Sequence, residues 1–142
     1  MSEKRIKVLV VDDQALVLDI LAKGLAKDPM IDVVGTATDG YLALNQVARL
    51  KPDVIVLDME MPRMNGIQFL LNLMPVNPIP TIVLSALTEK DSKVTSEAFE
   101  AGAVDFLPKP SAGARGLPEL FSQLYTKIKL AAAQDVSHFK KV

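Results

Sequence analysis

Four apolar segments of this sequence each end in polar side chains that could act together. In chain order, the residues at these ends are Asp12 and Asp13, Asp58, Ser85, and Lys109. If the segments are neighbouring parallel strands, their carboxyl ends share one edge of a sheet, and open α/β folds place their ligand sites at that edge. The edge would then carry three carboxylates, one hydroxyl and one ammonium group.

Each of these residues also has an ordinary structural interpretation. Asp13 stands just before a predicted helix and could serve as its amino-terminal cap. Asp58 and Ser85 could be loop and turn residues, and Lys109 could be a solvated surface lysine. Their coincidence at four separate strand ends favours a shared site, because independent surface placement would rarely bring these residue types together.

The combination of residue types indicates one kind of chemistry. Two unit charges about 4 Å apart repel by roughly 4 kcal/mol at an effective dielectric constant of about 20, so clustered carboxylates need a cation. Oxygen ligands with room for water and phosphate oxygens suit Mg²⁺. A carboxylate can also act as a covalent nucleophile toward phosphorus. Lys109 would neutralise the oxygens of the transferred group, and Ser85 would donate a hydrogen bond to one of them.

Strand-like runs alternate along the chain with segments of helical periodicity, which is typical of βαβ units and a parallel sheet. We predict strands at residues 6–11, 32–38, 54–57, 82–84 and 104–107, and helices at residues 15–26, 40–50, 67–73, 90–101 and 118–133. The second strand contains Gly35 and is predicted to lie at an edge of the sheet. The residues of the first helix with the spacing of a core-facing stripe are Leu16, Ile20, Leu21 and Leu25.

The composition restricts the class of protein. The chain has 142 residues, of which 49% are hydrophobic, enough for one domain with a full core. We predict a domain over residues 1–133, followed over residues 134–142 by a frayed tail or the start of an interdomain linker. A formal net charge of −1 gives no general attraction to nucleic acid or to anionic lipid.

Two further absences in the sequence guide the expected location. There is no cysteine, so disulfides and thiolate metal sites are excluded. The amino terminus lacks the apolar core of a signal peptide, and no stretch approaches the roughly 18 apolar residues of a membrane span. We therefore expect a cytoplasmic protein with no membrane insertion and no nucleic-acid partner.

At its polar strand ends the sequence resembles the response-regulator receiver domains of two-component signalling. The segments that carry the resemblance are the acidic pair, residues 57–62 with Gly66, Ser85-Ala86, and residues 102–110. The resemblance extends over about residues 4–133. It implies an α/β fold class, namely a single doubly wound, flavodoxin-like (βα)5 domain whose parallel five-stranded sheet has the order 2-1-3-4-5. It also implies a separate histidine kinase as the phosphoryl donor.

The same resemblance implies a role for each site residue. Asp58 would be the phosphorylation site. The Mg²⁺ ligands would be Asp13, Asp58 and the backbone carbonyl of Glu60, with Asp12 acting through a bound water. Lys109 would pair with the phosphoryl group, and the peptide bond between Lys109 and Pro110 would be cis.

A conformational switch is implied as well. When Asp58 is phosphorylated, the Ser85 hydroxyl would move toward it, and the ring of Phe106 would turn into the vacated space. The face formed by the fourth helix, fifth strand and fifth helix would change as a result. Glu60 and Leu87 occupy positions that the family uses to tune the lifetime of the phosphoryl group.

Within the family, the greatest likeness is to the regulatory domain of the chemotaxis protein-glutamate methylesterase, on residues 33–37, 58–66 and 85–106. This likeness implies a chemotaxis kinase as partner and a methylesterase domain elsewhere in the parent protein. The chain itself contains no G-x-S-x-G nucleophile elbow, and its one histidine, His138, lies in the tail. A stand-alone single-domain response regulator is the alternative, and whether the parent is an enzyme is left open.

Other function classes explain the sequence less well. An aspartyl-phosphate phosphatase of the haloacid-dehalogenase type uses the same residue types, but its nucleophilic Asp comes first and its acidic pair last, which reverses the order found here. A flavodoxin-like flavin module would need a phosphate cradle after the first strand, where this chain has two carboxylates. A P-loop nucleotide enzyme would need a G-x-x-x-x-G-K motif, which is absent. A purely structural interaction module leaves the polar edge unexplained.

Overall fold

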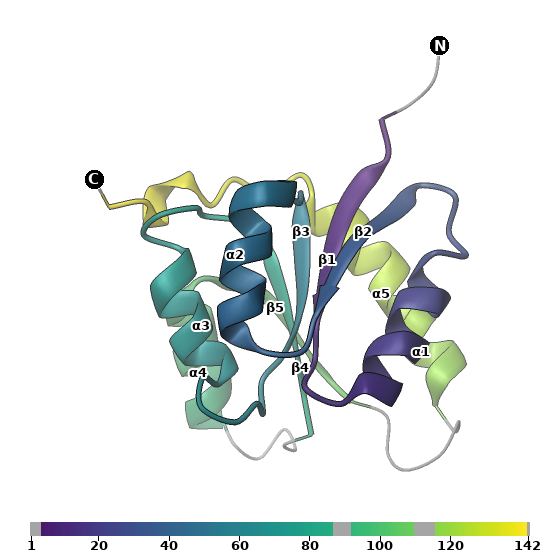
Figure 1. Cartoon of the computed structure of the whole chain (residues 1–142), viewed down its shortest axis with the longest axis horizontal. Coiled ribbons are helices and arrows are strands. Elements are labelled where there is room, and N and C mark those ends of the chain that lie inside the picture. Colours follow the sequence, from purple (N-terminus) through teal and green to yellow (C-terminus); the bar gives the residue numbers. More distant parts are fainter. Residues whose placement is uncertain (1–3, 87–91, 110–115, 142) are drawn as a thin grey trace.

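Five parallel strands form the centre of the molecule, in the order β2-β1-β3-β4-β5 (Figure 1). This computed structural model describes residues 4–86, 92–109 and 116–141. The strands are β1 (Ile6–Val11), β2 (Ile31–Ala37), β3 (Val54–Asp58), β4 (Thr81–Ser85) and β5 (Ala103–Pro108). The predicted fold class, strand order and edge position of β2 are confirmed.

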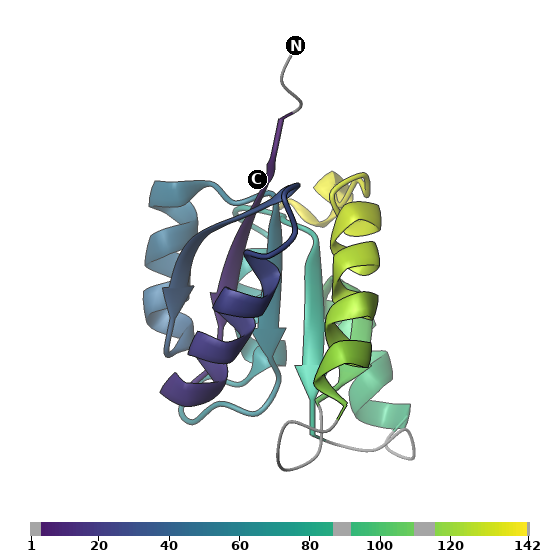
Figure 2. The ribbon, with the colours of Figure 1, turned by 90° about the vertical axis from the view of Figure 1, so that its right-hand side faces the viewer.

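Helices cover both faces of the sheet, because the chain moves in one direction along the sheet from β1 to β2 and in the other from β2 to β5, and right-handed crossovers then lie on opposite faces. They are α1 (Ala15–Leu25), α2 (Gly40–Leu50), α3 (Gly66–Leu73), α4 (Ser92–Ala101) and α5 (Leu117–Ala131). Figure 1 shows the sheet almost edge-on, between α1 and α5 on one side and α2, α3 and α4 on the other, and Figure 2 looks onto the sheet from the side of α1 and α5. The central strands β3 and β4 are therefore buried along their whole length, and the edge strand β2 is only partly buried.

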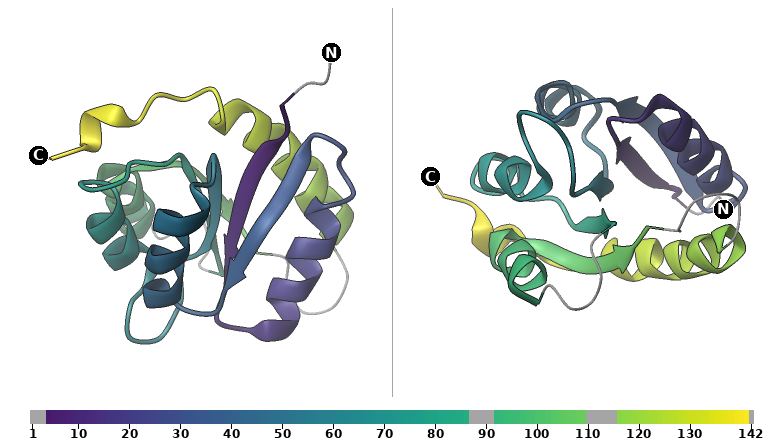
Figure 3. Two further views of the ribbon diagram at one scale, coloured as in Figure 1. Left: turned by 45° about the horizontal axis from the view of Figure 1, so that its top comes forward. Right: turned by 90° about the horizontal axis from the view of Figure 1, so that it is seen from below.

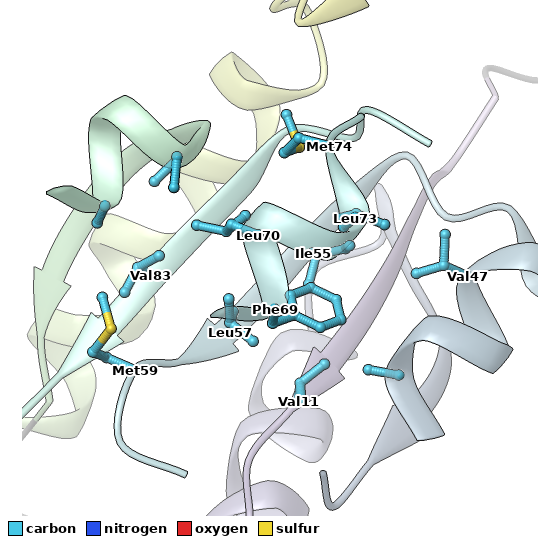
Figure 4. Packing of buried hydrophobic residues seen from close by; sticks show 14 of the residues in the cluster. Val11, Val47, Ile55, Leu57, Met59, Phe69, Leu70, Leu73, Met74 and Val83 are labelled. Atoms are coloured by element: carbon cyan, nitrogen blue, oxygen red, sulfur yellow. The ribbon is translucent and has the colours of Figure 1, made fainter. Parts of the chain in front are cut away.

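Alternation along the strands supplies two separate cores. In β1, Val8 and Val10 pack with the α1 and α5 side chains, whereas Leu9 and Val11 pack with those of α2, α3 and α4. Figure 4 shows part of the second cluster, in which the fully buried ring of Phe69 from α3 lies among β-strand side chains. The two cores fix the sheet from both sides and hold the strand ends in a defined register.

Helix α1 packs against the sheet with a face that differs in part from the predicted one. Leu16 is 73% exposed and Ile20 is 37% exposed, so the expected core positions at these two residues are wrong. The expected core positions at Leu21 and Leu25 are confirmed, and Leu18 and Gly24 are buried as well. Both sets have helical spacing, because leucine and isoleucine occur on more than one face of this helix, and only packing against the sheet selects between them.

The carboxyl-terminal tail packs against the domain and is not frayed. It passes over the end of the sheet where the strands begin, from α5 toward α3, and contains a short 3₁₀ helix, Ser137–Phe139 (Figures 1 and 3). Val136 is 6% exposed, and the Lys141 amide donates to the Pro75 carbonyl at 2.9 Å. His138 lies in this tail, at the opposite end of the sheet from the polar strand ends. Among the described residues, no helix has the length and hydropathy needed to cross a membrane.

Candidate functional site

Three carboxylates gather at the carboxyl edge of the central strands. Asp12 and Asp13 follow β1, and Asp58 is the last residue of β3. Strands β1 and β3 are paired up to Val11 and Leu57, so the acidic residues leave the sheet side by side. One oxygen from each of the three carboxylates lies within 4.8 Å of the others. The juxtaposition predicted from the strand ends is therefore present.

Lys109 joins this cluster from the far side of β4. It follows the last residue of β5, and its backbone amide donates to the Ser85 carbonyl at 2.8 Å, which extends the pairing of β4 and β5. Its Nζ lies 2.8 Å from Asp58 Oδ1 and 3.3 Å from Asp12 Oδ2. One ammonium group thus serves two carboxylates, and the group of four side chains keeps a net negative charge.

The cluster is withdrawn from solvent but incompletely hydrogen-bonded. Asp12 is 0% exposed and Asp58 is 1% exposed. Asp58 Oδ1 accepts from Lys109 and from the backbone amide of Glu60 at 3.2 Å, whereas Asp58 Oδ2 has no hydrogen-bond partner among the described residues. Asp12 Oδ1 accepts from the Gln14 amide at 2.9 Å; Asp12 Oδ2 has the ion pair with Lys109 but no hydrogen bond of good geometry. Buried carboxylate oxygens without donors are costly unless a further partner binds there.

The electrostatics of the site follow from this arrangement. Burial, together with the neighbouring carboxylates of Asp12 and Asp13, raises the pKa of Asp58 to about 7, against the opposing effect of Lys109. For Lys109, burial alone would lower the pKa, but the contacts with Asp58 and Asp12 outweigh burial and raise it. Lys109 is therefore a permanent cation, while Asp58 is a carboxyl group that further positive charge would help to ionise.

The donor set fits a hard divalent cation. It consists of carboxylate oxygens only, two of which are buried without a hydrogen-bond donor. Asp13 is half-buried, and it does not cap α1, because the cap residue of that helix is Gln14. Its side chain is thus available as a ligand. Such oxygen sites with remaining room for water suit Mg²⁺.

Ser85 stands at the same edge, one residue beyond the register partner of Asp58, which is Leu84. Its side chain is fully buried, and its hydroxyl donates to Glu60 Oε2 at 2.6 Å. The backbone amide of Ala86 donates to the other oxygen, Glu60 Oε1, at 2.8 Å. The Glu60 carboxylate thus bridges the two groups that follow Leu84.

The loop after β3 brings Glu60 into this position. It folds back on itself, since the Gly66 amide donates to the Met59 carbonyl at 2.9 Å. A Cβ atom at Gly66 would lie 3.0 Å from the Met59 Cα, tighter than side chains tolerate without movement of the backbone. Gly66 therefore permits the close approach that keeps residues 59–65 beside the strand end. The loop also begins α3 with a capping box between Asn65 and Gln68.

The remaining predicted residues lie around the cluster or outside the described part of the chain. Phe106 is half-buried in β5, opposite Val83, and packs against the core on the side of α2, α3 and α4. Pro110 and Leu87 lie outside the described residues, so the cis peptide bond between Lys109 and Pro110 stays a prediction. Ligation by the Glu60 carbonyl and by Asp12 through water also stay predictions.

Sequence reasoning missed the side chain of Glu60 and the amide of Ala86 as parts of the site. It singled out Glu60 for its carbonyl and for its position relative to Asp58, but nothing in the pattern indicated where the carboxylate points. The only available signal was the type of residue, an acidic side chain two positions after a strand-end aspartate. A long side chain in a loop can reach several partners, and the pattern does not choose among them.

Comparison with known proteins agrees with this geometry. Residues 8–120 match the family model described as the response regulator receiver domain. Among curated proteins, the protein-glutamate methylesterase/protein-glutamine glutaminase of Syntrophotalea carbinolica is 53% identical over 138 residues, which is 96% of this chain and 39% of that protein. A protein of the same name from Xanthomonas campestris is 47% identical over 136 residues, 95% of this chain and 38% of that protein. The chain thus spans less than half the length of these relatives.

Solved structures give the same result. The response regulator domain of Thermotoga maritima CheB is 40% identical, with a TM-score of 0.86 over 93% of this chain and 99% of that chain. A chain in the CheX-CheY-BeF3-Mg²⁺ complex of Borrelia burgdorferi is 27% identical, with a TM-score of 0.69 over 85% of this chain and 90% of that chain.

Proposed function

The chain belongs to the response-regulator receiver domain family, and on that premise we propose that it accepts a phosphoryl group on Asp58 from the phosphohistidine of a separate kinase. One observation carries the proposal: a buried carboxylate has one oxygen paired with a lysine and the other without a hydrogen-bond donor. No hydrogen-bond donor occupies the lone pairs of this oxygen, so they are available for attack on phosphorus. The proposed reaction is a phosphoryl transfer in which a carboxylate acts as the nucleophile.

The atoms of the transfer balance without a further reactant. Oδ2 of Asp58 attacks the phosphorus atom, a phosphorus–oxygen bond forms, and the phosphorus–nitrogen bond to the donor imidazole breaks. The departing imidazole takes up a proton from water, and the ionised Asp58 carboxylate becomes an acyl phosphate. Lys109, already 2.8 Å from Asp58 Oδ1, would shift its donors toward the oxygens of the transferred group and offset their charge.

Asp13, Asp58 and the backbone carbonyl of Glu60 are the proposed ligands of a Mg²⁺ ion, with Asp12 acting through a water molecule. When bound, Mg²⁺ would neutralise the clustered carboxylates and the developing charge on the phosphoryl oxygens. The buried, donor-free oxygens of Asp12 and Asp58 support such an occupant. The related Borrelia burgdorferi complex contains both BeF3 and Mg²⁺, which is consistent with this assignment.

Ser85 and Phe106 are the proposed switch. The Ser85 hydroxyl would turn toward the phosphoryl group, the Phe106 ring would follow into the space it leaves, and the face of α4, β5 and α5 would change. Phe106 is half-buried in β5 and packs against the core beside that face, which supports the proposal. Comparing its ring resonances by NMR with and without beryllofluoride tests this step; identical environments would remove it.

The central experiment is phosphorylation with acetyl phosphate in the presence of Mg²⁺, followed by intact-mass measurement. We expect wild-type protein to gain one phosphoryl group and Asp58→Asn to gain none. Asp19→Asn provides the matched control, because Asp19 is an exposed carboxylate on α1 that pairs with Lys23 at the surface. Full labelling of Asp58→Asn at another residue would overturn the assignment of the phosphorylation site.

We further propose that the parent protein is a chemotaxis protein-glutamate methylesterase whose activity this domain regulates. The similarity to methylesterases over nearly the whole chain supports this, and the chain spans 39% of the first relative. Such a protein would work in the cytoplasm with a chemotaxis histidine kinase. A native reading frame that continues into a serine hydrolase signature, with glutamyl methyl ester hydrolysis that rises on beryllofluoride binding, is the expected result. A reading frame that ends near Val142 would instead assign a stand-alone regulator.

A further inference from the structure

The Glu60 carboxylate occupies a small anion-binding site at the end of β4. Its two oxygens accept from the Ser85 hydroxyl at 2.6 Å and from the Ala86 amide at 2.8 Å. The Ser85 side chain is fully buried, whereas Glu60 and Ala86 are exposed. Hydrogen bonds to an ionised carboxylate are shorter and stronger than neutral ones. In the resting molecule, the exposed Glu60 side chain therefore accepts the hydrogen bonds of both donors.

These two donors follow the register partner of Asp58 at the same edge of the sheet. Asp58 is paired in register with Leu84, and Ser85 and Ala86 are the next two residues of the chain. The Met59 amide donates to the Leu84 carbonyl at 2.8 Å, so β3 and β4 remain joined beyond Asp58. A hydroxyl and a backbone amide pointing to one anion form an oxyanion-binding pair, and a tetrahedral phosphoryl group on Asp58 would need the same pair.

We propose that the Glu60 side chain is an internal competitor of the phosphoryl group, which clamps Ser85 and Ala86 in the resting state and has to leave before a phosphorylated Asp58 can engage them. This inference rests on the proposed function. Two anions cannot share one hydroxyl hydrogen and one amide hydrogen, and Glu60 would also be repelled by the added charge. The clamp makes Glu60 a positioning residue for the switch serine.

The clamp differs from a general effect of negative charge near the site. A charge effect would act on any anion that approaches Asp58 and would not depend on the Ser85 hydroxyl. The clamp acts through specific hydrogen bonds, so its effect on anion binding shrinks when the Ser85 hydroxyl is removed and only the bond from the Ala86 amide remains. A double-mutant cycle between Glu60 and Ser85 separates the two, because it isolates the coupling between residues in contact.

The first test uses the resting protein and needs no phosphorylation. In metal-free wild-type protein, the Ala86 amide proton should be shifted downfield and protected from exchange by its charge-assisted bond. Glu60→Ala should move it upfield and speed its exchange, while Glu100→Gln, which removes a charge from the distant end of α4, should leave both unchanged. An Ala86 amide that does not respond to Glu60→Ala would overturn the clamp, even if Asp58 is phosphorylated normally.

The second test measures the affinity for beryllofluoride with Mg²⁺. Because the bonds to be broken are charge-assisted, we expect Glu60→Ala to bind roughly tenfold more tightly than wild type, with Glu60→Gln in between. In a Ser85→Ala background the gain from Glu60→Ala should shrink markedly. An equal gain in both backgrounds, or a gain of the same size in Glu100→Gln, would overturn the proposal. Failure of wild type to bind beryllofluoride would count against the proposed function instead, and the Ala86 amide would still decide the clamp.

Discussion

Lys109 and Asp58 form an ion pair of 2.8 Å across strand β4, although Lys109 follows β5 and Asp58 ends β3. The same ammonium group also lies 3.3 Å from Asp12, so one cation balances two buried carboxylates. The pair is therefore a structural requirement of the resting protein as well as a part of the proposed transfer site.

Replacing Lys109 by methionine should destabilise the metal-free protein by roughly 3 kcal/mol, because it leaves two buried carboxylates without their cation. Urea unfolding at pH 8 in the presence of a chelator measures this change. Lys127→Met is the matched control, since Lys127 pairs with Asp105 at a partly exposed position and should cost about 1 kcal/mol or less. Equal losses in the two variants would contradict the role given to the Lys109 pair.

Stability should fall as the pH rises through the range in which Asp58 titrates. Its pKa is about 7 in the folded, metal-free protein and near 3.8 in the unfolded chain, so between these values the native state holds a proton that the unfolded state has lost. The free energy of unfolding should therefore decrease from about pH 4 to about pH 7 and level off above. Asp58→Asn should remove this contribution; a profile unchanged by the substitution would refute the assignment. The measurement is urea unfolding with a chelator present.

Asp13→Asn should have opposite effects on folding and on metal binding. Loss of one of three clustered carboxylates relieves repulsion, so the metal-free protein should gain about 1 kcal/mol of stability, the value being modest because Asp13 is half-buried and screened. The affinity for Mg²⁺, measured by calorimetry, should drop at least tenfold through the loss of a charged ligand. Asp19→Asn again serves as the surface control. Mg²⁺ affinity that survives Asp13→Asn would remove this residue from the ligand set.

The packed tail should contribute to the stability of the domain. Val136 is buried against the core on the side of α3, and Phe139 packs beside it. Val136→Ala should lower the free energy of unfolding by roughly 1–3 kcal/mol, and a chain ending at Ala133 should lose at least as much. Ser137→Ala, at an exposed position next to Val136 in the same tail, is the control. If a chain ending at Ala133 unfolds at the same urea concentration as the full chain, the tail does not contribute to the stability of the domain.

Much of the architecture was predictable because its signals are local. Parallel strands buried on both faces need continuous apolar runs, and the runs at β1, β3 and β4 gave the position of the polar residues that follow them. The prediction of clustered carboxylates with Lys109 required only that these strand ends share an edge. Helix α1 shows the limit of periodicity, since Leu16 and Leu18 both belong to plausible stripes and only the sheet decides that Leu18 is buried.

The sequence by itself determined where the apolar strands end and which polar residues follow them. It thereby placed Asp12, Asp13, Asp58, Ser85 and Lys109 at one edge of an α/β sheet. Only the tertiary structure decided that the Ser85 hydroxyl is held by Glu60, that Asp58 keeps one oxygen without a donor, and that the tail lies against the core. The physical reason is that some features depend on residues close in sequence and others on residues far apart in sequence. The emergence of a side chain from a strand is set by neighbours in sequence, whereas the partner of a long loop side chain or of a terminal segment is set by distances that exist only after the chain has folded.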